Sequence, residues 1–206
     1  MESRNYTNKQ IPRIVKDDCS IVTSQYEILN ETKLFYENLY KKRNIVDTEN
    51  LSERLNLYNF PTLKEEESNS LEGLVTNSEV LYFLKRMKND KSPGPDGFSC
   101  EFFKFFWKDI GTFLTRAINN SYENQQFSEP NKLSVITCLP KTGKDKQFLK
   151  NWRPISLLNV VYKIASGCIA ERIKKYLNKI INNDQTGFIK GRFIGENIRL
   201  IYDLLQ

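Results

Sequence analysis

Residues 133–158 are LSVITCLPKTGKDKQFLKNWRPISLL, and this stretch predicts a β-hairpin. Its two ends are rich in β-branched and other apolar residues, which favour strands, and a polar loop containing a glycine separates them. Lys141 closes the first strand and Arg153 opens the second, so a hairpin brings an ammonium and a guanidinium to the same end. Arginine offers a planar fork of donors and lysine a mobile point charge, which together suit a triphosphate or a backbone phosphate.

A second basic segment, DQTGFIKGR (184–192), contains Lys190 and Arg192. Gly191 allows the backbone to approach a ligand closely, and the N-terminus of the helix expected next attracts anions. For either basic segment alone, ordinary solvated charges are the simpler interpretation. The two together favour phosphate binding.

Charge is distributed unevenly along the chain. The net charge of +6 combines 13 Lys/Arg against 15 Asp/Glu in residues 1–90, net −2, with 18 against 10 in residues 91–206, net +8. A positive field of this kind attracts polyanions, so nucleic acid or nucleotide is the first candidate partner. A solubilising surface explains the charge equally well.

The chain has no histidine, which excludes Ser-His and Cys-His mechanisms. A metal ion would have to bind carboxylates and be a hard ion such as Mg²⁺. The four cysteines lack disulfide or zinc spacing, so a reducing, intracellular compartment is expected. The sequence shows neither a secretory signal nor an apolar run near the ~20 residues that span a bilayer, so no membrane association is expected.

Apolar periodicity predicts an α+β fold that is mostly helical. A small hairpin or extended lead-in is expected at 11–24, and helices are expected at 24–42, from Thr76 or Asn77 to about 88, from Ser99 through Ile118, at 159–182 and at 195–205. Three segments follow from this pattern. They are an N-terminal lead-in and helix (1–46), a polar linker with fragments of helix (47–76) and a main region (77–206).

Three details of packing are also expected. The aromatic cluster FFKFFW (102–107) has the spacing of a buried helical face, which we favour over a base-stacking surface. Gly167 lies inside a helix at a cost of about 1 kcal/mol relative to alanine, which indicates close packing there. Arg172 and the neighbouring lysines are expected largely on the outside of the same helix.

Some carboxylates resemble metal ligands only superficially. Asp17 and Asp18 form a pair at the tip of the first hairpin, as catalytic aspartates do in several polymerases. An ordinary solvated turn is the better interpretation, because the usual preceding aromatic is missing. Asp96, within PGPDG (93–97), fits a type I turn. We therefore assign no metal ligand and no catalytic residue.

Five blocks follow one another along the chain: KSPGPDGF (91–98), ITCLPKTGKD (136–145), NWRPISLLNVVYKI (151–164), AERIKKYL (170–177) and DQTGFIKGR (184–192). In this order they closely resemble the amino-terminal part of reverse transcriptases from non-LTR (LINE-type) retrotransposons. The resemblance covers about residues 21–206, and FYENLY (35–40) is similar to the segment that links an upstream endonuclease to the polymerase.

The resemblance implies the fingers and early palm connection of a right-hand polymerase. In that family a lysine and an arginine reach the incoming dNTP, and the resemblance places Lys141 and Arg153 at these two positions. The family's counterpart of the last block contacts template or nucleotide, and the resemblance places Lys190, Gly191 and Arg192 at these positions. Expected partners are an RNA template, a DNA primer, dNTP, and the palm, thumb and endonuclease of the parent protein. The family implies a ribonucleoprotein present in the nucleus and cytoplasm.

The family's palm aspartates, which bind two metal ions, have no counterpart in these residues. The palm core is therefore expected to be missing, with no cofactor in this fragment and Mg²⁺ required by the complete polymerase. We expect the chain alone to be inactive as an RNA-directed DNA polymerase. The alternatives are a non-catalytic nucleic-acid-binding module, an inactive relic of a truncated element, or helix-mediated assembly through residues 24–42.

Overall fold

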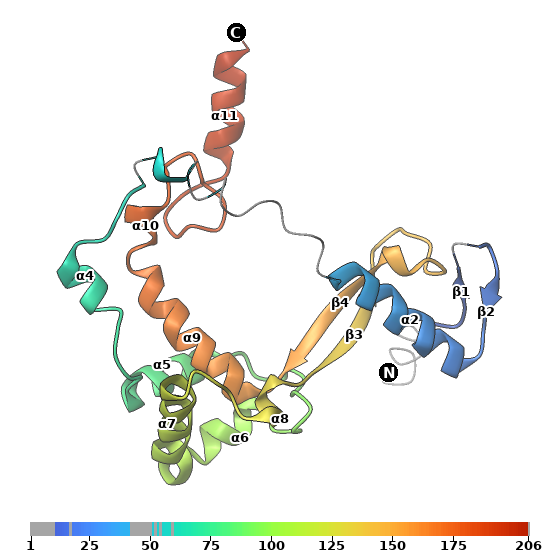
Figure 1. The fold of residues 1–206 in the computed structure, drawn as a ribbon, viewed down its shortest axis with the longest axis horizontal. Helices are drawn as coiled ribbons and strands as arrows, with labels where there is room; N and C mark the ends of the chain where they lie inside the picture. Colours follow the sequence, from blue (N-terminus) through green and yellow to red (C-terminus); the bar gives the residue numbers. More distant parts are fainter. Residues whose placement is uncertain are drawn as a thin grey trace. The chain divides into compact units, whose positions relative to one another are not determined.

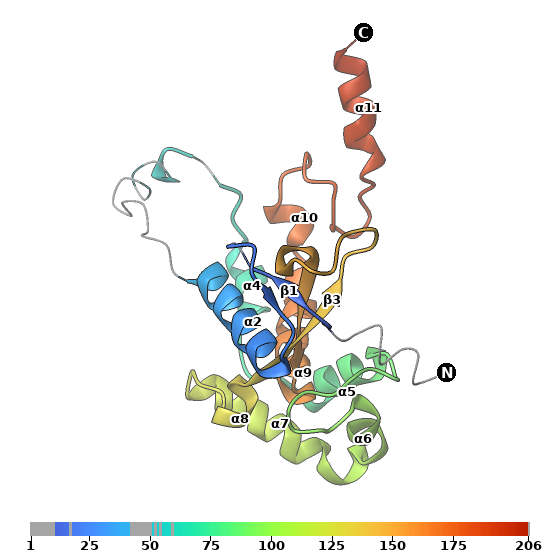
Figure 2. The same ribbon diagram turned by 90° about the vertical axis from the view of Figure 1, so that its right-hand side faces the viewer.

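The computed structural model describes residues 11–16, 18–41, 51, 53, 55–58 and 60–205. It is a mixed α and β structure in which about half of the described residues are helical and the sheets are small. The chain divides into two compact units (Figures 1 and 2). Unit 1 combines the N-terminal part, up to position 52, with Ser134–Leu157, and unit 2 combines Glu53–Leu133 with the residues from Leu158 onward.

Unit 1 contains both hairpins. In the first, Ile14 lies opposite Val22 and Val15 opposite Ile21 in an antiparallel pair, which confirms the hairpin expected at 11–24. The elements of this unit are β1 (Ile14–Val15), β2 (Ile21–Val22), α2 (Gln25–Tyr40), β3 (Ser134–Pro140), the 3-10 turn Leu149–Asn151 and β4 (Trp152–Leu158), whose last residue falls at the boundary.

A small apolar core joins the parts of unit 1. Ile14 and Val22 from the first hairpin pack with Ile28 of α2 and with Leu149 from the second hairpin's loop. The Val15 N–H also donates to the Gln147 carbonyl at 2.9 Å. The loop between β3 and β4 is therefore anchored to the N-terminal hairpin.

The secondary-structure elements described in unit 2 are helices, apart from Leu158, the last residue of β4. Its helices are α4 (Glu65–Asn69), α5 (Asn77–Arg86), α6 (Cys100–Phe105), α7 (Trp107–Glu123), α8 (Glu129–Lys132), α9 (Val160–Lys174), α10 (Leu177–Ile180) and α11 (Gly195–Leu204). In both views α5, α6, α7 and α9 lie side by side (Figures 1 and 2). Their shared core consists of Val75, Val80, Leu84, Cys100, Phe103, Leu114, Ile118, Val160, Ile164, Ala165 and Cys168.

The start of α5 follows directly from its sequence. Thr76 is the N-cap: its hydroxyl accepts from the Glu79 N–H at 3.3 Å, and the Thr76 N–H donates to the Glu79 carboxylate at 2.8 Å. This capping box satisfies two of the donors that a helix N-terminus leaves unpaired. The helix predicted from Thr76 or Asn77 is confirmed, although it ends at Arg86.

The single helix predicted from Ser99 is wrong, because the chain breaks at Phe106 into α6 and α7. The aromatic cluster is buried only in part. Phe103 is 7% exposed in the core, whereas Phe105 is 80% exposed. Phe102 and Trp107 are partly buried against the same core. The helix predicted at 159–182 is likewise divided, into α9 and α10.

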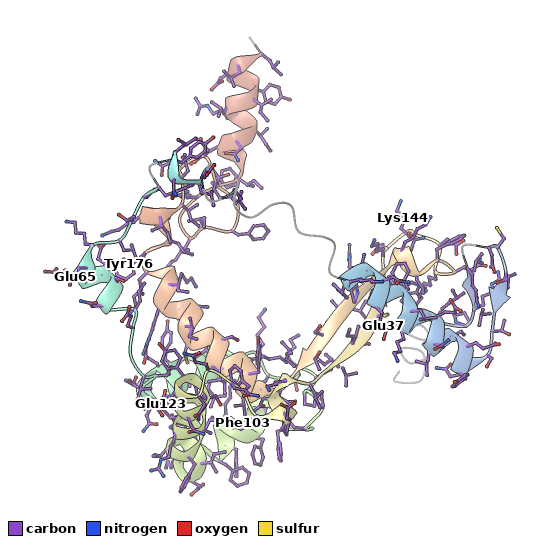
Figure 3. The ribbon with its side chains drawn as sticks, viewed as in Figure 1. Glu37, Glu65, Phe103, Glu123, Lys144 and Tyr176 are labelled. Atoms are coloured by element: carbon purple, nitrogen blue, oxygen red, sulfur yellow. The ribbon has the colours of Figure 1, made fainter. Side chains whose placement is uncertain are left out.

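The packing predicted at Gly167 is confirmed. A Cβ at this position would collide with the Phe83 ring of α5, so only glycine lets the two helices approach this closely. Tyr176, the N-cap of α10, is labelled in Figure 3. Its hydroxyl lies 2.8 Å from the hydroxyl of Ser70, the C-cap of α4, so the start of α10 is connected to the end of α4. None of the helices described is long and apolar enough to span a membrane.

Candidate nucleic-acid interface

The predicted basic hairpin is present. Residues Ser134–Pro140 and Trp152–Leu158 are strands that pair with each other. At the loop end, the Lys141 N–H donates to the Asn151 carbonyl at 2.9 Å and closes the ladder. Lys141 directly follows β3 and Arg153 is the second residue of β4, so both belong to the same end of the hairpin, as expected.

The loop between the strands is held by its own hydrogen bonds. Trp152 is 3% exposed, and its indole N–H donates to the Lys146 carbonyl at 2.8 Å. The Asn151 side chain donates to the Asp145 carbonyl at 2.8 Å, and the Asp145 carboxylate accepts from the Gln147 N–H at 2.9 Å. This order leaves Lys144 exposed in the loop (Figure 3).

The two candidate nucleotide-binding residues differ in how many hydrogen bonds their side chains form within the protein. The Lys141 ammonium donates to the Lys150 carbonyl at 2.7 Å, which uses one of its protons. Arg153 is exposed and, among the described residues, its guanidinium forms neither a hydrogen bond nor an ion pair. Arg153 can therefore offer its whole fork of donors to a ligand.

Arg192 is bonded within its own loop. Its guanidinium donates to the Ile181 and Gln185 carbonyls at 2.9 Å each, and also to the Asn182 carbonyl. In this conformation the side chain holds the loop between α10 and α11 together. A template contact by Arg192 stays a prediction.

Lys190 and Gly191 precede this arginine in the same loop. Gly191 has a φ of +86°, a left-handed conformation that glycine adopts without strain, and a Cβ there would meet nothing within 4 Å. Lys190 is exposed and pairs with no carboxylate among the described residues. Of the three predicted template-binding residues, Lys190 is the available charge.

The expectation that Arg172 lies on the outside is wrong. Its side chain is 11% exposed and binds Glu79, with Nε to Oε1 at 2.6 Å and Nη2 to Oε2 at 2.9 Å. These hydrogen bonds lower the pKa of Glu79 to about 2. The partners are 93 residues apart, so no local pattern could reveal the pair.

Asn159, which the sequence did not single out, organises the residues before α9. It is 1% exposed; its amide oxygen accepts from the Asp96 N–H at 3.3 Å, and its amide nitrogen donates to the Pro130 carbonyl at 3.0 Å. The Gly97 N–H donates to the Gly94 carbonyl at 3.1 Å, so the predicted turn is present. Asn159 therefore joins the PGPDG turn to α8 and α9.

The described residues contain no set of three or more potential metal-ligating Cys, Asp or Glu side chains. Of the aspartate pair at the first hairpin tip, Asp17 lies outside the described residues. The Asp18 carboxylate accepts from the Ser20 N–H at 2.9 Å and from the Ser20 hydroxyl at 2.6 Å. These bonds are those of a turn residue.

Comparison with known proteins gives related sequences. The transposon TX1 uncharacterized 149 kDa protein of Xenopus laevis is 33% identical over 208 residues, covering 100% of this chain and 15% of that protein. The chain is homologous to transposon proteins. Two Drosophila melanogaster relatives, the probable RNA-directed DNA polymerases from transposon X-element and transposon BS, are each 28% identical, over 61% and 62% of this chain.

These homologues confirm the resemblance to a reverse transcriptase-related region of non-LTR elements. No family model matches the chain. The chain spans only 14% to 15% of the length of these relatives. What the relatives' names say of activity therefore does not transfer directly to these residues.

Proposed function

We propose that the chain is part of the fingers region of an RNA-directed DNA polymerase from a LINE-type retrotransposon. The observation that carries this proposal is the homology to transposon proteins, two of them described as probable RNA-directed DNA polymerases, in a chain that has the five ordered blocks. The mixed fold, with a basic hairpin in unit 1, supports it.

In this proposal the hairpin contacts phosphates. Arg153 presents its guanidinium fork to the triphosphate of an incoming dNTP, and Lys141 adds a charge beside it. Pro154 follows Arg153 in β4 and restricts the backbone next to the arginine, so less freedom is lost on binding. The loop of Lys190 and Gly191 contacts template RNA.

The complete polymerase is proposed to use Mg²⁺, which would neutralise the phosphates and activate the primer hydroxyl. The described residues do not fit such a site, because no group of three or more suitable ligands comes together among them. No chemical step is therefore assigned to these residues. Their part is to bind and orient template and nucleotide.

RNA binding across a salt series tests the proposal. The variant Lys141→Gln/Arg153→Gln is expected to bind single-stranded RNA at least about tenfold more weakly at low salt. The slope of log affinity against log salt should become shallower by about 0.7 for each phosphate that the variant no longer neutralises. Filter binding at several salt concentrations measures both quantities, and competition by dNTP tests the nucleotide contact.

A matched control separates specific contacts from overall charge. Lys85→Gln/Lys108→Gln removes the same charge from exposed positions on α5 and α7. It should leave the affinity within about twofold of the parent chain. Equal losses in the two double variants would show that only net charge matters, and would count against a built hairpin site.

Primer extension tests whether these residues form an active polymerase by themselves. With an RNA template, DNA primer, Mg²⁺ and dNTPs, the 206 residues should extend no primer. Extension would show that the metal ligands lie within this chain. Specific RNA binding without extension fits both a polymerase segment and the alternative, a non-catalytic binding module. Restored extension when the chain is supplied with a palm-containing polypeptide would favour the polymerase segment.

A further inference from the structure

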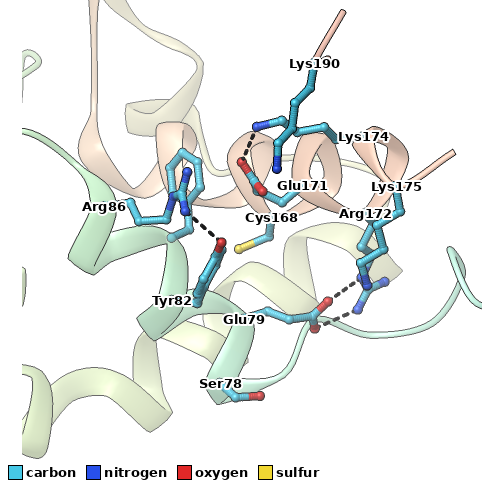
Figure 4. A pocket seen from close by; sticks show the side chains of 11 residues that line it. Ser78, Glu79, Tyr82, Arg86, Cys168, Glu171, Arg172, Lys174, Lys175 and Lys190 are labelled. Carbon is cyan, nitrogen blue, oxygen red and sulfur yellow. Dashed lines mark hydrogen bonds and ion pairs between the residues drawn. The ribbon is translucent and has the colours of Figure 1, made fainter. Parts of the chain in front are cut away.

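Unit 2 contains a pocket of about 600 Å³ that involves neither Lys141 nor Arg153 (Figure 4). Helices α5 and α9 form its walls, and Lys190 enters from the loop before α11. Its size lies within the range of about 300 to 1,000 Å³ typical of small-molecule sites. Among the residues that predict a nucleic-acid function, only Lys190 belongs to it.

The floor of the pocket is apolar and aromatic. Phe83 and Cys168 line it, and Gly167 allows the Phe83 ring to lie directly against α9. Tyr82 stands at the side with half of its surface exposed. A flat, exposed aromatic ring beside an apolar floor provides a stacking surface for a nucleobase.

Tyr82 also holds a cation in position. The Arg86 Nη1 donates to the Tyr82 hydroxyl at 2.8 Å, and the guanidinium carbon lies 5.2 Å from the centre of the ring. The other donors of Arg86 have no partner among the described residues. Figure 4 shows Arg86 and Tyr82 on one side of Cys168, with Lys174 and Lys190 on the other.

The charges around the pocket do not cancel. Glu79 is neutralised by Arg172, and Glu171 lies 3.3 Å from the Lys174 ammonium. The remaining lining cations are Arg86, Lys175 and Lys190, and none of them has a carboxylate within 4.0 Å among the described residues. Unpaired cations around one cavity attract an anion.

We propose that this pocket binds a nucleotide, with the base against Tyr82 and the phosphate between Arg86 and Lys190, while Lys175 adds positive charge at the end of the pocket beside Arg172. A bare phosphate ion would use the cations and leave the aromatic floor without a role, whereas a nucleotide uses both. The site is additional to the hairpin. It rests on the proposed function in identifying the ligand as a nucleotide, either free or part of an RNA strand, and it shares Lys190 with the proposed template contact. Arg86 and Tyr82 belong to the pocket alone.

Binding of AMP and of a single-stranded RNA octamer to the full chain, measured by calorimetry, tests the proposal. Arg86→Gln/Lys190→Gln should weaken at least one of the two probes by tenfold or more. Loss of AMP binding identifies a free nucleotide as the ligand. Loss confined to the octamer identifies a nucleotide within a strand. Circular dichroism of each variant checks that the helices are retained.

Matched controls remove the same groups elsewhere in unit 2. Lys108→Gln/Arg116→Gln takes two exposed cations from α7, and Tyr122→Leu removes a tyrosine that is 53% exposed, compared with 50% for Tyr82. Tyr82→Leu should weaken the affected probe at least fivefold, whereas both α7 variants should stay within twofold of the parent chain.

Two results would overturn the proposal. If Arg86→Gln/Lys190→Gln binds both probes as the parent chain does, the pocket is not a binding site. If the charge variant binds weakly but Tyr82→Leu binds normally, the pocket holds an anion without a base. Loss of binding only in Lys141→Gln/Arg153→Gln would overturn the pocket and leave the hairpin proposal standing. Loss of binding only in Arg86→Gln/Lys190→Gln and Tyr82→Leu would support the pocket and overturn the hairpin proposal.

Discussion

Arg172 and Glu79 form a two-bond ion pair that joins α9 to the start of α5, with N–O distances of 2.6 and 2.9 Å. The same guanidinium also donates to the Gly73 carbonyl at 2.8 Å and the Leu74 carbonyl at 2.9 Å. Glu79 meanwhile completes the capping box of α5. One arginine therefore fixes both the connection into α5 and its packing against α9.

Replacing this arginine should destabilise unit 2 even when charge is kept. Arg172→Lys cannot reproduce the planar fork, so carbonyls and one carboxylate oxygen lose their donors. We expect the free energy of unfolding to fall by about 2 kcal/mol, the scale for leaving partly buried polar groups unpaired. Urea denaturation followed by circular dichroism measures this change.

An exposed arginine provides the comparison. Arg199 lies 3.8 Å from Asp203 on α11 with 84% of its side chain exposed. Arg199→Lys should change the free energy of unfolding by less than about 0.5 kcal/mol, as surface ion pairs do. A similar small change for Arg172→Lys would show that the carbonyl bonds add nothing to stability.

The Glu79 carboxylate makes stability depend on pH in a defined direction. Its pKa falls from 4.5 to about 2 in the folded chain, chiefly because Arg172 donates to it. A carboxylate with a lowered folded pKa stabilises the fold above its unfolded pKa, and this contribution is lost as the pH falls from about 4.5 towards about 2.

The urea midpoint of the parent chain should therefore fall between pH 5 and pH 3. Glu79→Gln, which cannot ionise, should start from a lower midpoint and show a smaller fall over the same interval. Other carboxylates titrate in this range, so the difference between the two proteins is the informative quantity. Parallel pH profiles for the parent chain and Glu79→Gln would contradict the assignment.

Features with local signals were predictable from the sequence. Strand propensity around a polar loop predicts β3 and β4, and Thr76 followed three residues later by Glu79 is a capping signature that starts α5. The PGPDG turn follows from proline and glycine alone. In each case the determining residues lie within a few positions of one another.

The break between α6 and α7 was not predictable in this way. Aromatic residues occupy nearly every position of FFKFFW, so the apolar pattern has no clear helical phase. Which rings are buried is decided by the helices packed against them, and Phe103 rather than Phe105 faces the core. The apolar stripe of α11 is exposed in this structure, although its spacing resembles a core face.

The sequence could not show which basic side chains are free to bind a ligand and which are bonded within the protein. Arg153, Arg172 and Arg192 are alike in the sequence, each a cation in a basic segment. In the structure Arg172 and Arg192 bond to backbone carbonyls of their own unit, whereas Arg153 forms no such bond among the described residues. Tertiary partners distant in sequence decide which cations remain available to a ligand.

Gly167 should tolerate no side chain. Alanine is favoured over glycine in a helix by about 1 kcal/mol, but overpacking a core costs about 1 to 3 kcal/mol. Because a Cβ would collide with the Phe83 ring, we expect Gly167→Ala to destabilise unit 2 in urea denaturation. When Gly167→Ala is introduced into the Phe83→Leu variant, it should lower the free energy of unfolding by less than it does in the parent chain. An equal cost in both backgrounds would show that Phe83 is not the obstacle.

The last prediction concerns Asn159, whose buried side chain joins the PGPDG turn to α8. Asn159→Asp keeps the shape but replaces the donor to the Pro130 carbonyl with an oxygen and buries a charge at a position that is 1% exposed. We expect a loss of at least about 2 kcal/mol and faster hydrogen exchange at Asp96 and Gly97. Asn178→Asp, at a surface-facing position before Lys179, provides the control and should change neither quantity. Unchanged exchange at Asp96 in a destabilised Asn159→Asp would show that the turn holds its conformation without this hydrogen bond.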